Sequence, residues 1–173
     1  NLASQPPPTG RAVDLGPSKS NLQARVVPGI GYACIAGWLQ SPTTPREHVG
    51  KFGYDLQLVD VDALSGTAKN AGQIRDAIMA MRQEAGPPRV VLFGYSKGTP
   101  DVLDAVVRYP ELQQRVAAVV SIAGAVAGSP LANDASQWEA DMFRHWPKAE
   151  CDSGDGGAVA SLRPDVRKAW LAE

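Results

Sequence analysis

The amino-acid sequence predicts an α/β fold, a three-layer sandwich in which helices flank a mainly parallel sheet. Strand-like and helix-like segments alternate along most of the chain, which is typical of this class. Residues 116–124 form a continuous apolar run, as expected for a parallel strand that is covered on both faces. Residues 89–93, which are apolar after Arg89, form a second run that leads through a glycine-flanked turn at residues 94–98 into a helical segment. The crossovers between the strands are expected to be right-handed.

Composition limits the class of protein. The chain has 173 residues, of which 44% are hydrophobic, enough to bury one sizeable core in one domain. The net charge is −1 and the basic residues are scattered, so no nucleic-acid partner is indicated. No apolar run approaches the length that crosses a bilayer, so no transmembrane segment is expected. No cofactor or metal ion is indicated.

Proline and glycine residues divide the first third of the chain. Residues 1–20 are rich in proline and small polar residues and are expected to form a flexible arm. Residues 25–27 predict a short strand, followed by a glycine-rich loop and a helix that reaches residue 38. Residues 54–62 alternate apolar and polar side chains, which predicts a strand with one buried face. Asp60 and Asp62 near its end are expected to be solvated carboxylates rather than a metal or acid pair.

Four later segments predict helices. Residues 70–84 carry apolar side chains at helical spacing and charges on the opposite face. Residues 101–107 are expected to form a helix that stops at Tyr109-Pro110, with structural carboxylates near its start. Residues 136–146 and 162–171 are expected to be helical as well. Their aromatic residues either pack or line an acyl site; these are Trp138, Phe143, Trp146 and Trp170.

The turn at residues 94–98 carries chemistry when it lies between a strand and a helix. Gly94 and Gly98 lack a Cβ, so the chain can reverse sharply there. Such a turn raises the hydroxyl of Ser96 above the carboxyl ends of the strands. It also directs the backbone N–H of Lys97, at the N-terminus of the next helix, towards a developing oxyanion. The pattern predicts Ser96 as a nucleophile; the alternative is a chance meeting of two glycines and a serine.

With this turn, residues 25–130 resemble the α/β-hydrolase superfamily, which includes serine esterases and lipases. The resemblance implies that the visible strands are the third to sixth of that fold, lying in the order fourth, third, fifth, sixth. The Pro28-Gly29-Ile30 segment resembles the loop that follows the third strand. The resemblance implies that the N–H of Ile30, or next that of Gly31, is the second oxyanion donor. The alternative is an ordinary glycine-rich turn.

The rest of a catalytic triad is not found in the expected order. A serine hydrolase needs a base and an orienting acid, and this superfamily places both after the serine. His145 is the sole histidine after Ser96, and it falls in a helix that resembles a cap, which is an unusual position for the base. Asp134 and Asp141 are candidates for a displaced acid. His48 precedes the serine and is expected to be a solvated surface residue.

These gaps predict that the chain is the N-terminal portion of a longer hydrolase. Residues 21–130 would be an incomplete hydrolase core, and residues 131–173 a helical, cap-like segment. The remaining C-terminal part of the same hydrolase would then supply the acid and the base.

The two cysteines leave two alternatives open. Cys34 lies in an apolar setting and Cys151 in a polar loop. They form either one long-range disulfide in an exported or periplasmic protein, or two unrelated thiols.

The function favoured by these features is hydrolysis of small-molecule carboxylic esters, as by an esterase, lipase or thioesterase. The missing acid and base favour an alternative from another class, a non-catalytic hydrolase-like scaffold or an inactive fragment. A flavodoxin-like or Rossmann-like domain would also contain four β/α units, but no Gly-x-Gly-x-x-Gly opens the first helix.

Overall fold

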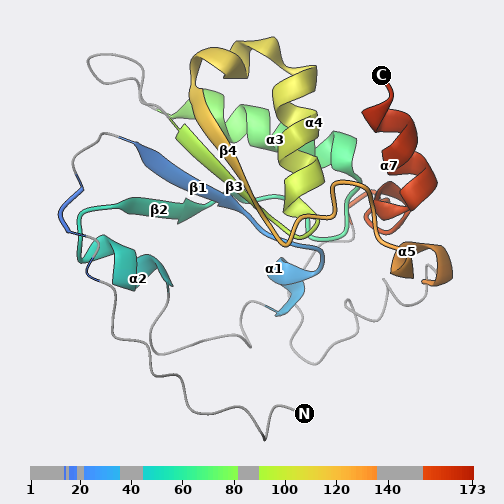
Figure 1. Ribbon diagram of the computed structural model, residues 1–173, viewed down its shortest axis with the longest axis horizontal. Coiled ribbons are helices and arrows are strands. Elements are labelled where there is room, and N and C mark those ends of the chain that lie inside the picture. Colours follow the sequence, from blue (N-terminus) through green and yellow to red (C-terminus); the bar gives the residue numbers. More distant parts are fainter. Residues whose placement is uncertain (1–13, 15, 19–21, 36–44, 82–89, 136–153) are drawn as a thin grey trace, which may run out of the picture.

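A four-stranded parallel sheet forms the centre of the fold (Figure 1). The structure is a computed structural model that describes residues 14, 16–18, 22–35, 45–81, 90–135 and 154–173. Its strands are β1 (Gln23–Val27), β2 (Asp55–Leu58), β3 (Val90–Tyr95) and β4 (Val116–Ile122). They lie in the order β2-β1-β3-β4, and each neighbouring pair is parallel. This order confirms the predicted arrangement of fourth, third, fifth and sixth strands.

Helices flank the sheet, which confirms the predicted fold class. α3 (Thr67–Ala80) and α4 (Gly98–Arg108) lie side by side above the sheet in Figure 1, and α2 (Pro45–Gly50) lies below it, next to β2. α3 buries Ile74 and Ile78, which are four residues apart and therefore share one face. Among the described helices, none is both long and apolar enough to cross a membrane.

The main hydrophobic core lies between this helix pair and the sheet. Burying each large aliphatic side chain contributes about 1.5–3 kcal/mol relative to leaving it in water. The core holds β1 and β3 in a register that places Val27 opposite Gly94, so the residues that follow both strands start from one edge. Its larger members are Val27, Val59, Val61, Ile74, Ile78, Val90, Leu92, Val102 and Leu112.

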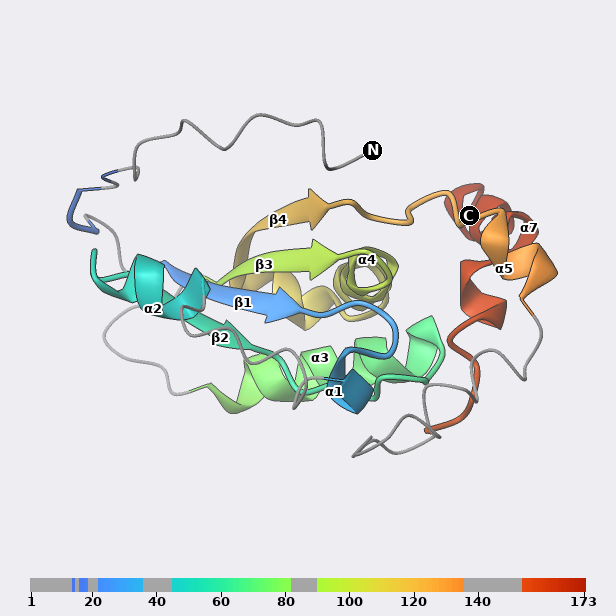
Figure 2. The same ribbon diagram turned by 90° about the horizontal axis from the view of Figure 1, so that it is seen from below.

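All four strands point to the same end of the molecule, where α1 (Tyr32–Ile35), α5 (Leu131–Asp134) and α7 (Pro164–Leu171) lie (Figure 2). Two short 3-10 helices, η2 (Pro110–Gln114) and η3 (Ala160–Leu162), complete the described elements. In open parallel sheets, ligands bind outside the carboxyl ends of the strands. A functional site is therefore expected at the loops that follow β1 and β3.

The element boundaries differ from the predictions by a few residues. α4 begins at Gly98 rather than at residue 101, with Pro100 in its first turn, where a missing N–H is tolerated. α3 begins at Thr67 rather than at residue 70, and β2 ends at Leu58 rather than at residue 62. The predicted helix at residues 136–146, the predicted ends at 36–38 and 82–84, and most of the 1–20 arm lie outside the described residues.

β4 was wrongly predicted to be covered on both faces. Val120 and Ile122 are 36% and 43% exposed. Within the described part of the chain, β4 pairs with β3 alone and forms one edge of the sheet. The prediction failed because an apolar run shows what a strand can bury but not whether neighbouring elements are there to cover it.

Candidate active site

The turn at Ser96 lies between the end of β3 at Tyr95 and the start of α4 at Gly98. Ser96 has a φ of 52°, in the left-handed region that costs a residue with a Cβ about 1–2 kcal/mol. Three backbone hydrogen bonds hold it there. The Ser96 N–H donates to the carbonyl of Ile122 at 2.9 Å, and the Ser96 carbonyl accepts from Thr99 and Ala125, each at 3.2 Å.

The two glycines of the turn are required by packing. A Cβ built on Gly94 would lie 2.4 Å from the Cα of Thr99. A Cβ built on Gly98 would lie 2.1 Å from the carbonyl oxygen of Val27, at the end of β1. Both contacts are with backbone, so a larger residue could not be accommodated by moving a side chain. The turn is therefore pressed against β1 and against the first turn of α4.

The loop after β1 lies beside Ser96. A Cβ built on Gly29 would lie 3.1 Å from the Cβ of Ser96, so the two backbones are close neighbours. The N–H of Gly31 donates to the carbonyl of Ala63 at 3.0 Å and is therefore engaged. Among the described residues, no acceptor takes the N–H of Ile30 or that of Lys97. Of the two predicted donors in this loop, Ile30 is the one whose N–H is available.

The side chain of Lys97 points into the protein and forms a buried ion pair. Its Nζ lies 2.8 and 2.7 Å from the two carboxylate oxygens of Asp101, and both side chains are 1% exposed. Asn70 of α3 donates to the same carboxylate at 2.8 Å. Burial raises the pKa of Asp101, and this outweighs the lowering effects of Lys97 and Asn70. The residue after the serine is thereby tied to both α3 and α4.

The loop after β4 supports the Ser96 turn as well, through a contact that no local sequence pattern marks. Ala123 has a φ of 48°, a second strained position. A Cβ built on Gly124 would lie 2.4 Å from the Oγ1 of Thr99, so the loop packs directly on α4. The Thr99 hydroxyl donates to the carbonyl of Gly94 at 2.7 Å. An Ala-Gly pair after a strand is too common to mark such a contact in advance.

Asp62 corrects a second prediction, because it is not a solvated carboxylate. It accepts hydrogen bonds from Ser65 and Gln73, each at 2.9 Å, and pairs with Lys69 at 2.8 Å. The hydrogen bond from Lys69 is the largest of the effects that lower the pKa of Asp62. Asp60 is exposed, as predicted. The described residues contain no group of three or more side chains that could hold a metal ion.

The predicted base and acids are not brought to Ser96 by the described residues. His145 and Asp141 lie outside the described residues. Asp134 is exposed in the short helix α5. His48 is exposed in α2, where its ring meets that of Phe52 edge to face at 5.5 Å, consistent with a surface residue.

The remaining predicted residues lie elsewhere. Cys34 is buried in α1 beside Ala63 and Leu64, and it is disulfide-bonded. Cys151 lies outside the described residues, so its pairing with Cys34 stays a prediction. Trp170 is half-buried in α7 and donates to Asp104 of α4 at 2.9 Å.

The chain is similar to the metagenomic carboxyl esterase MGS0156, with a TM-score of 0.77 and 36% identity over 100% of this chain and 52% of the esterase. It is also similar to the mature form of the Bacillus licheniformis lipase BlEst2, with a TM-score of 0.69 and 22% identity over 93% of this chain and 62% of the lipase. No protein-family model and no curated protein matches the sequence.

These likenesses show that the chain has a partial α/β-hydrolase fold, related in structure to esterases and lipases. The chain spans about half the length of the carboxyl esterase, so the likeness covers only that half of the esterase.

Proposed function

We propose that this chain is part of a serine hydrolase that cleaves carboxylic esters, with Ser96 as the nucleophile. The observation that carries the proposal is the strained turn at Ser96, with φ of 52° between a strand and a helix. A left-handed residue costs stability, and such strain persists where surrounding contacts over-determine it, often at functional sites. The 36% identity to a carboxyl esterase across the whole chain supports the same class of reaction.

In the proposed reaction the Oγ of Ser96 attacks the ester carbonyl carbon while a base takes the hydroxyl proton. The carbonyl oxygen becomes an oxyanion, which would accept hydrogen bonds from the N–H groups of Lys97 and Ile30. Collapse of this tetrahedral species breaks the bond to the alcohol, which leaves with the proton from the base. Water then attacks the acyl-serine by the same route, releasing the carboxylic acid and restoring Ser96.

Two contacts support Ile30, rather than Gly31, as the second oxyanion donor. Gly29 approaches Ser96 so closely that the loop carrying Ile30 lies beside the serine. The N–H of Gly31, by contrast, is already bonded to Ala63. We further propose that the base and the acid come either from the region around His145 or from the remaining part of a longer hydrolase. The substrate class is small esters; thioesters are included in the proposal because their carbonyl chemistry is the same.

The test is a Ser96→Ala variant of the full-length protein, assayed on p-nitrophenyl butyrate. Loss of one nucleophile should lower kcat by at least ~10³-fold, with the far-ultraviolet circular dichroism unchanged. Ser129→Ala is the matched control, because Ser129 is half-buried in the loop that precedes α5. Equal hydrolysis by Ser96→Ala and wild type would reject the proposal in favour of a non-catalytic scaffold.

A further inference from the structure

A buried ion pair begins one residue after the proposed nucleophile. Lys97, the N-cap residue of α4, follows Ser96, and its Nζ lies 2.8 and 2.7 Å from the two carboxylate oxygens of Asp101. Both side chains of the pair are 1% exposed. Taking two charges out of water is costly, and well-packed apolar residues in their place are often as stable or more so. Stability alone therefore does not account for this pair.

Asn70 of α3 connects the pair to the loop that follows β2. Its Nδ2 donates to the carboxylate of Asp101 at 2.8 Å and to the backbone carbonyl of Asp62 at 3.1 Å. Both of these groups accept, so they fix the orientation of the amide. The Oδ1 of Asn70 is buried and has no hydrogen-bond partner among the described residues, which costs stability. The amide is thus held for its two donor contacts.

The loop after β2 also holds Ile30, the other proposed oxyanion donor. The carbonyl of Ala63 in this loop accepts the N–H of Gly31 at 3.0 Å. The side chain of Ile30 packs against the buried cluster that contains Ala63. One loop therefore supports both proposed donors, Ile30 directly and Lys97 through the side chain of Asn70.

We propose that Asp101 and Asn70 are positioning residues that hold the backbone N–H of Lys97 in the oxyanion site. This role rests on the proposed hydrolase function, because it requires an oxyanion to form at Ser96. Donors to a developing charge are most effective when they are held in place beforehand. The donor is a main-chain N–H, which every residue except proline has. The side-chain anchor can therefore be removed without removing the donor.

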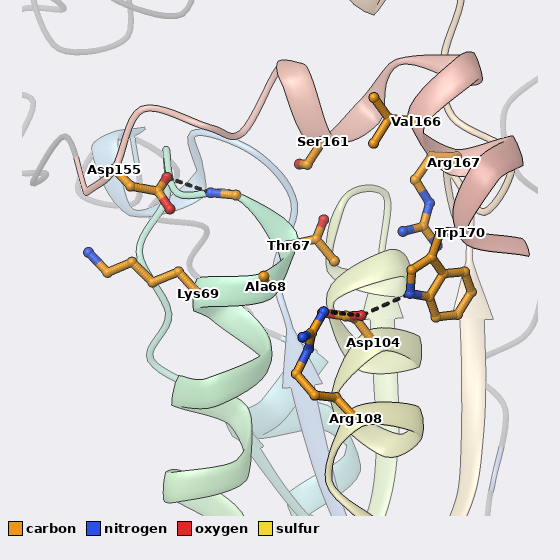
Figure 3. A pocket seen from close by; sticks show the side chains of 11 residues that line it. Thr67, Ala68, Lys69, Asp104, Arg108, Asp155, Ser161, Val166, Arg167 and Trp170 are labelled. Carbon is orange, nitrogen blue, oxygen red and sulfur yellow. Dashed lines mark hydrogen bonds and ion pairs between the residues drawn. The ribbon is translucent and has the colours of Figure 1, made fainter. Parts of the chain in front are cut away.

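Asp104, three residues after Asp101 on α4, provides a matched control. It is 2% exposed and also belongs to an i,i+4 ion pair, with Arg108. Figure 3 shows that its partners are Arg108 and Trp170, and Trp170 of α7 donates to it at 2.9 Å. Because its partners do not include the residue after the serine, a change at Asp104 separates positioning from a general loss of stability.

The test measures hydrolysis of p-nitrophenyl butyrate by the full-length protein that carries Lys97→Met together with Asp101→Leu. These changes replace the ion pair with apolar side chains and keep the main-chain N–H. kcat and kcat/KM should fall together by about tenfold or more, because a displacement of about 1 Å can cost about 10²-fold. Asp104→Asn should leave both within about twofold of wild type. Circular dichroism and urea unfolding measure the folding of each variant.

If the double variant does not fold, Asn70→Leu is the second variant. It keeps the ion pair, removes the connection to the loop after β2, and should lower kcat about fivefold or more. Wild-type kcat in the folded double variant or in Asn70→Leu would overturn the positioning role, as would an equal loss in Asp104→Asn. If Ser96→Ala is inactive, such a result leaves the hydrolase proposal standing. Full activity in Ser96→Ala would reject the hydrolase and this role together.

Discussion

At the scale of single residues, the fold uses glycine where the backbone of the Ser96 turn is most crowded. Gly98 approaches the carbonyl oxygen of Val27 so closely that a Cβ would lie 2.1 Å from it. Gly50, at the end of α2, has open space around the same position. The two glycines therefore differ in what they do, although both lie at a helix end.

Gly98→Ala is expected to lower the free energy of unfolding by about 2 kcal/mol or more, because β1 and the turn must separate to admit the methyl group. Gly50→Ala should leave it within about 0.5 kcal/mol of wild type or raise it slightly. Urea unfolding followed by circular dichroism measures both. Similar unfolding free energies for the two variants would contradict the tight contact at Gly98.

The buried pair of Lys97 and Asp101 should contribute to stability as one unit. Lys97→Met should cost about 3–5 kcal/mol, because it leaves a buried carboxylate without its cation. Asp101→Leu combined with Lys97→Met should cost less than the sum of the two single changes. Arg108→Met breaks an i,i+4 pair between an arginine that is 49% exposed and Asp104, which is 3% exposed but keeps its hydrogen bond from Trp170, so this change should cost less than Lys97→Met.

The measurement is a double-mutant cycle from urea unfolding curves. Additive losses from Lys97→Met and Asp101→Leu would show that the two side chains do not act as a pair.

Much of the Ser96 turn could be predicted because glycine, serine and strand length are local features of sequence. The close packing at Gly29 and Gly124 could not, because it depends on which side chains of other elements lie against each glycine. The inward direction of the Lys97 side chain was likewise hidden, since lysine is almost never fully buried unless paired. Its partner, Asp101, is four residues away, a spacing that is equally common on exposed helix faces.

At the scale of elements, the start of α3 is organised by carboxylates from outside the helix. Asp62 binds Ser65, Lys69 and Gln73, and Asp155 accepts from the N–H of Gly66. Burial raises the pKa of Asp155, but backbone hydrogen bonds bring it below its ordinary value overall. The hydrogen bond from the Gly66 N–H to Asp155 replaces a conventional capping side chain, which Gly66 lacks.

Asp62→Asn should therefore lower stability at pH 7 by about 1 kcal/mol, the order of a hydrogen bond to a charged group at a partly exposed site. The folded-state pKa of Asp62 is lowered, so its contribution is present above the unfolded pKa of about 3.9 and is lost as the pH falls through the folded value. The difference between wild type and Asp62→Asn should shrink below about pH 4.

Urea unfolding at several pH values measures this difference, and Asp60→Asn is the matched control because Asp60 is exposed two residues earlier. A difference for Asp62→Asn that stays constant from pH 7 to pH 3 would contradict the pairing.

α3 was predictable because its hydrophobic period indicates a helix, and β1 because a short apolar run precedes a glycine-rich loop, although β1 begins at Gln23 rather than at residue 25. The start of α4 was placed after Pro100, at residue 101, although proline is tolerated in a first turn. The extent of β2 was overestimated because residues 59–62 keep the alternating pattern after the strand has ended. The apolar run of β4 predicted that other elements cover both faces of this strand, but the structure leaves several of its side chains exposed.

At the scale of the whole molecule, the expected bond between Cys34 and Cys151 would close a loop around most of the chain. Cys34→Ser or Cys151→Ser should each cost about 2–5 kcal/mol, because the unfolded chain gains freedom that the bond removes. Peptide mapping without reduction identifies the pair, and urea unfolding measures the loss. Alkylation of both cysteines in the folded, unreduced protein would contradict the bond.

Ser96 is proposed to be an activated nucleophile in this partial hydrolase fold. The most direct test is the intact mass of the full-length protein before and after treatment with a fluorophosphonate, followed by peptide mapping. A single adduct is expected on the peptide that contains Ser96, and none is expected on the Ser96→Ala variant. A folded protein that takes no label, or takes it on another serine, would contradict the claim.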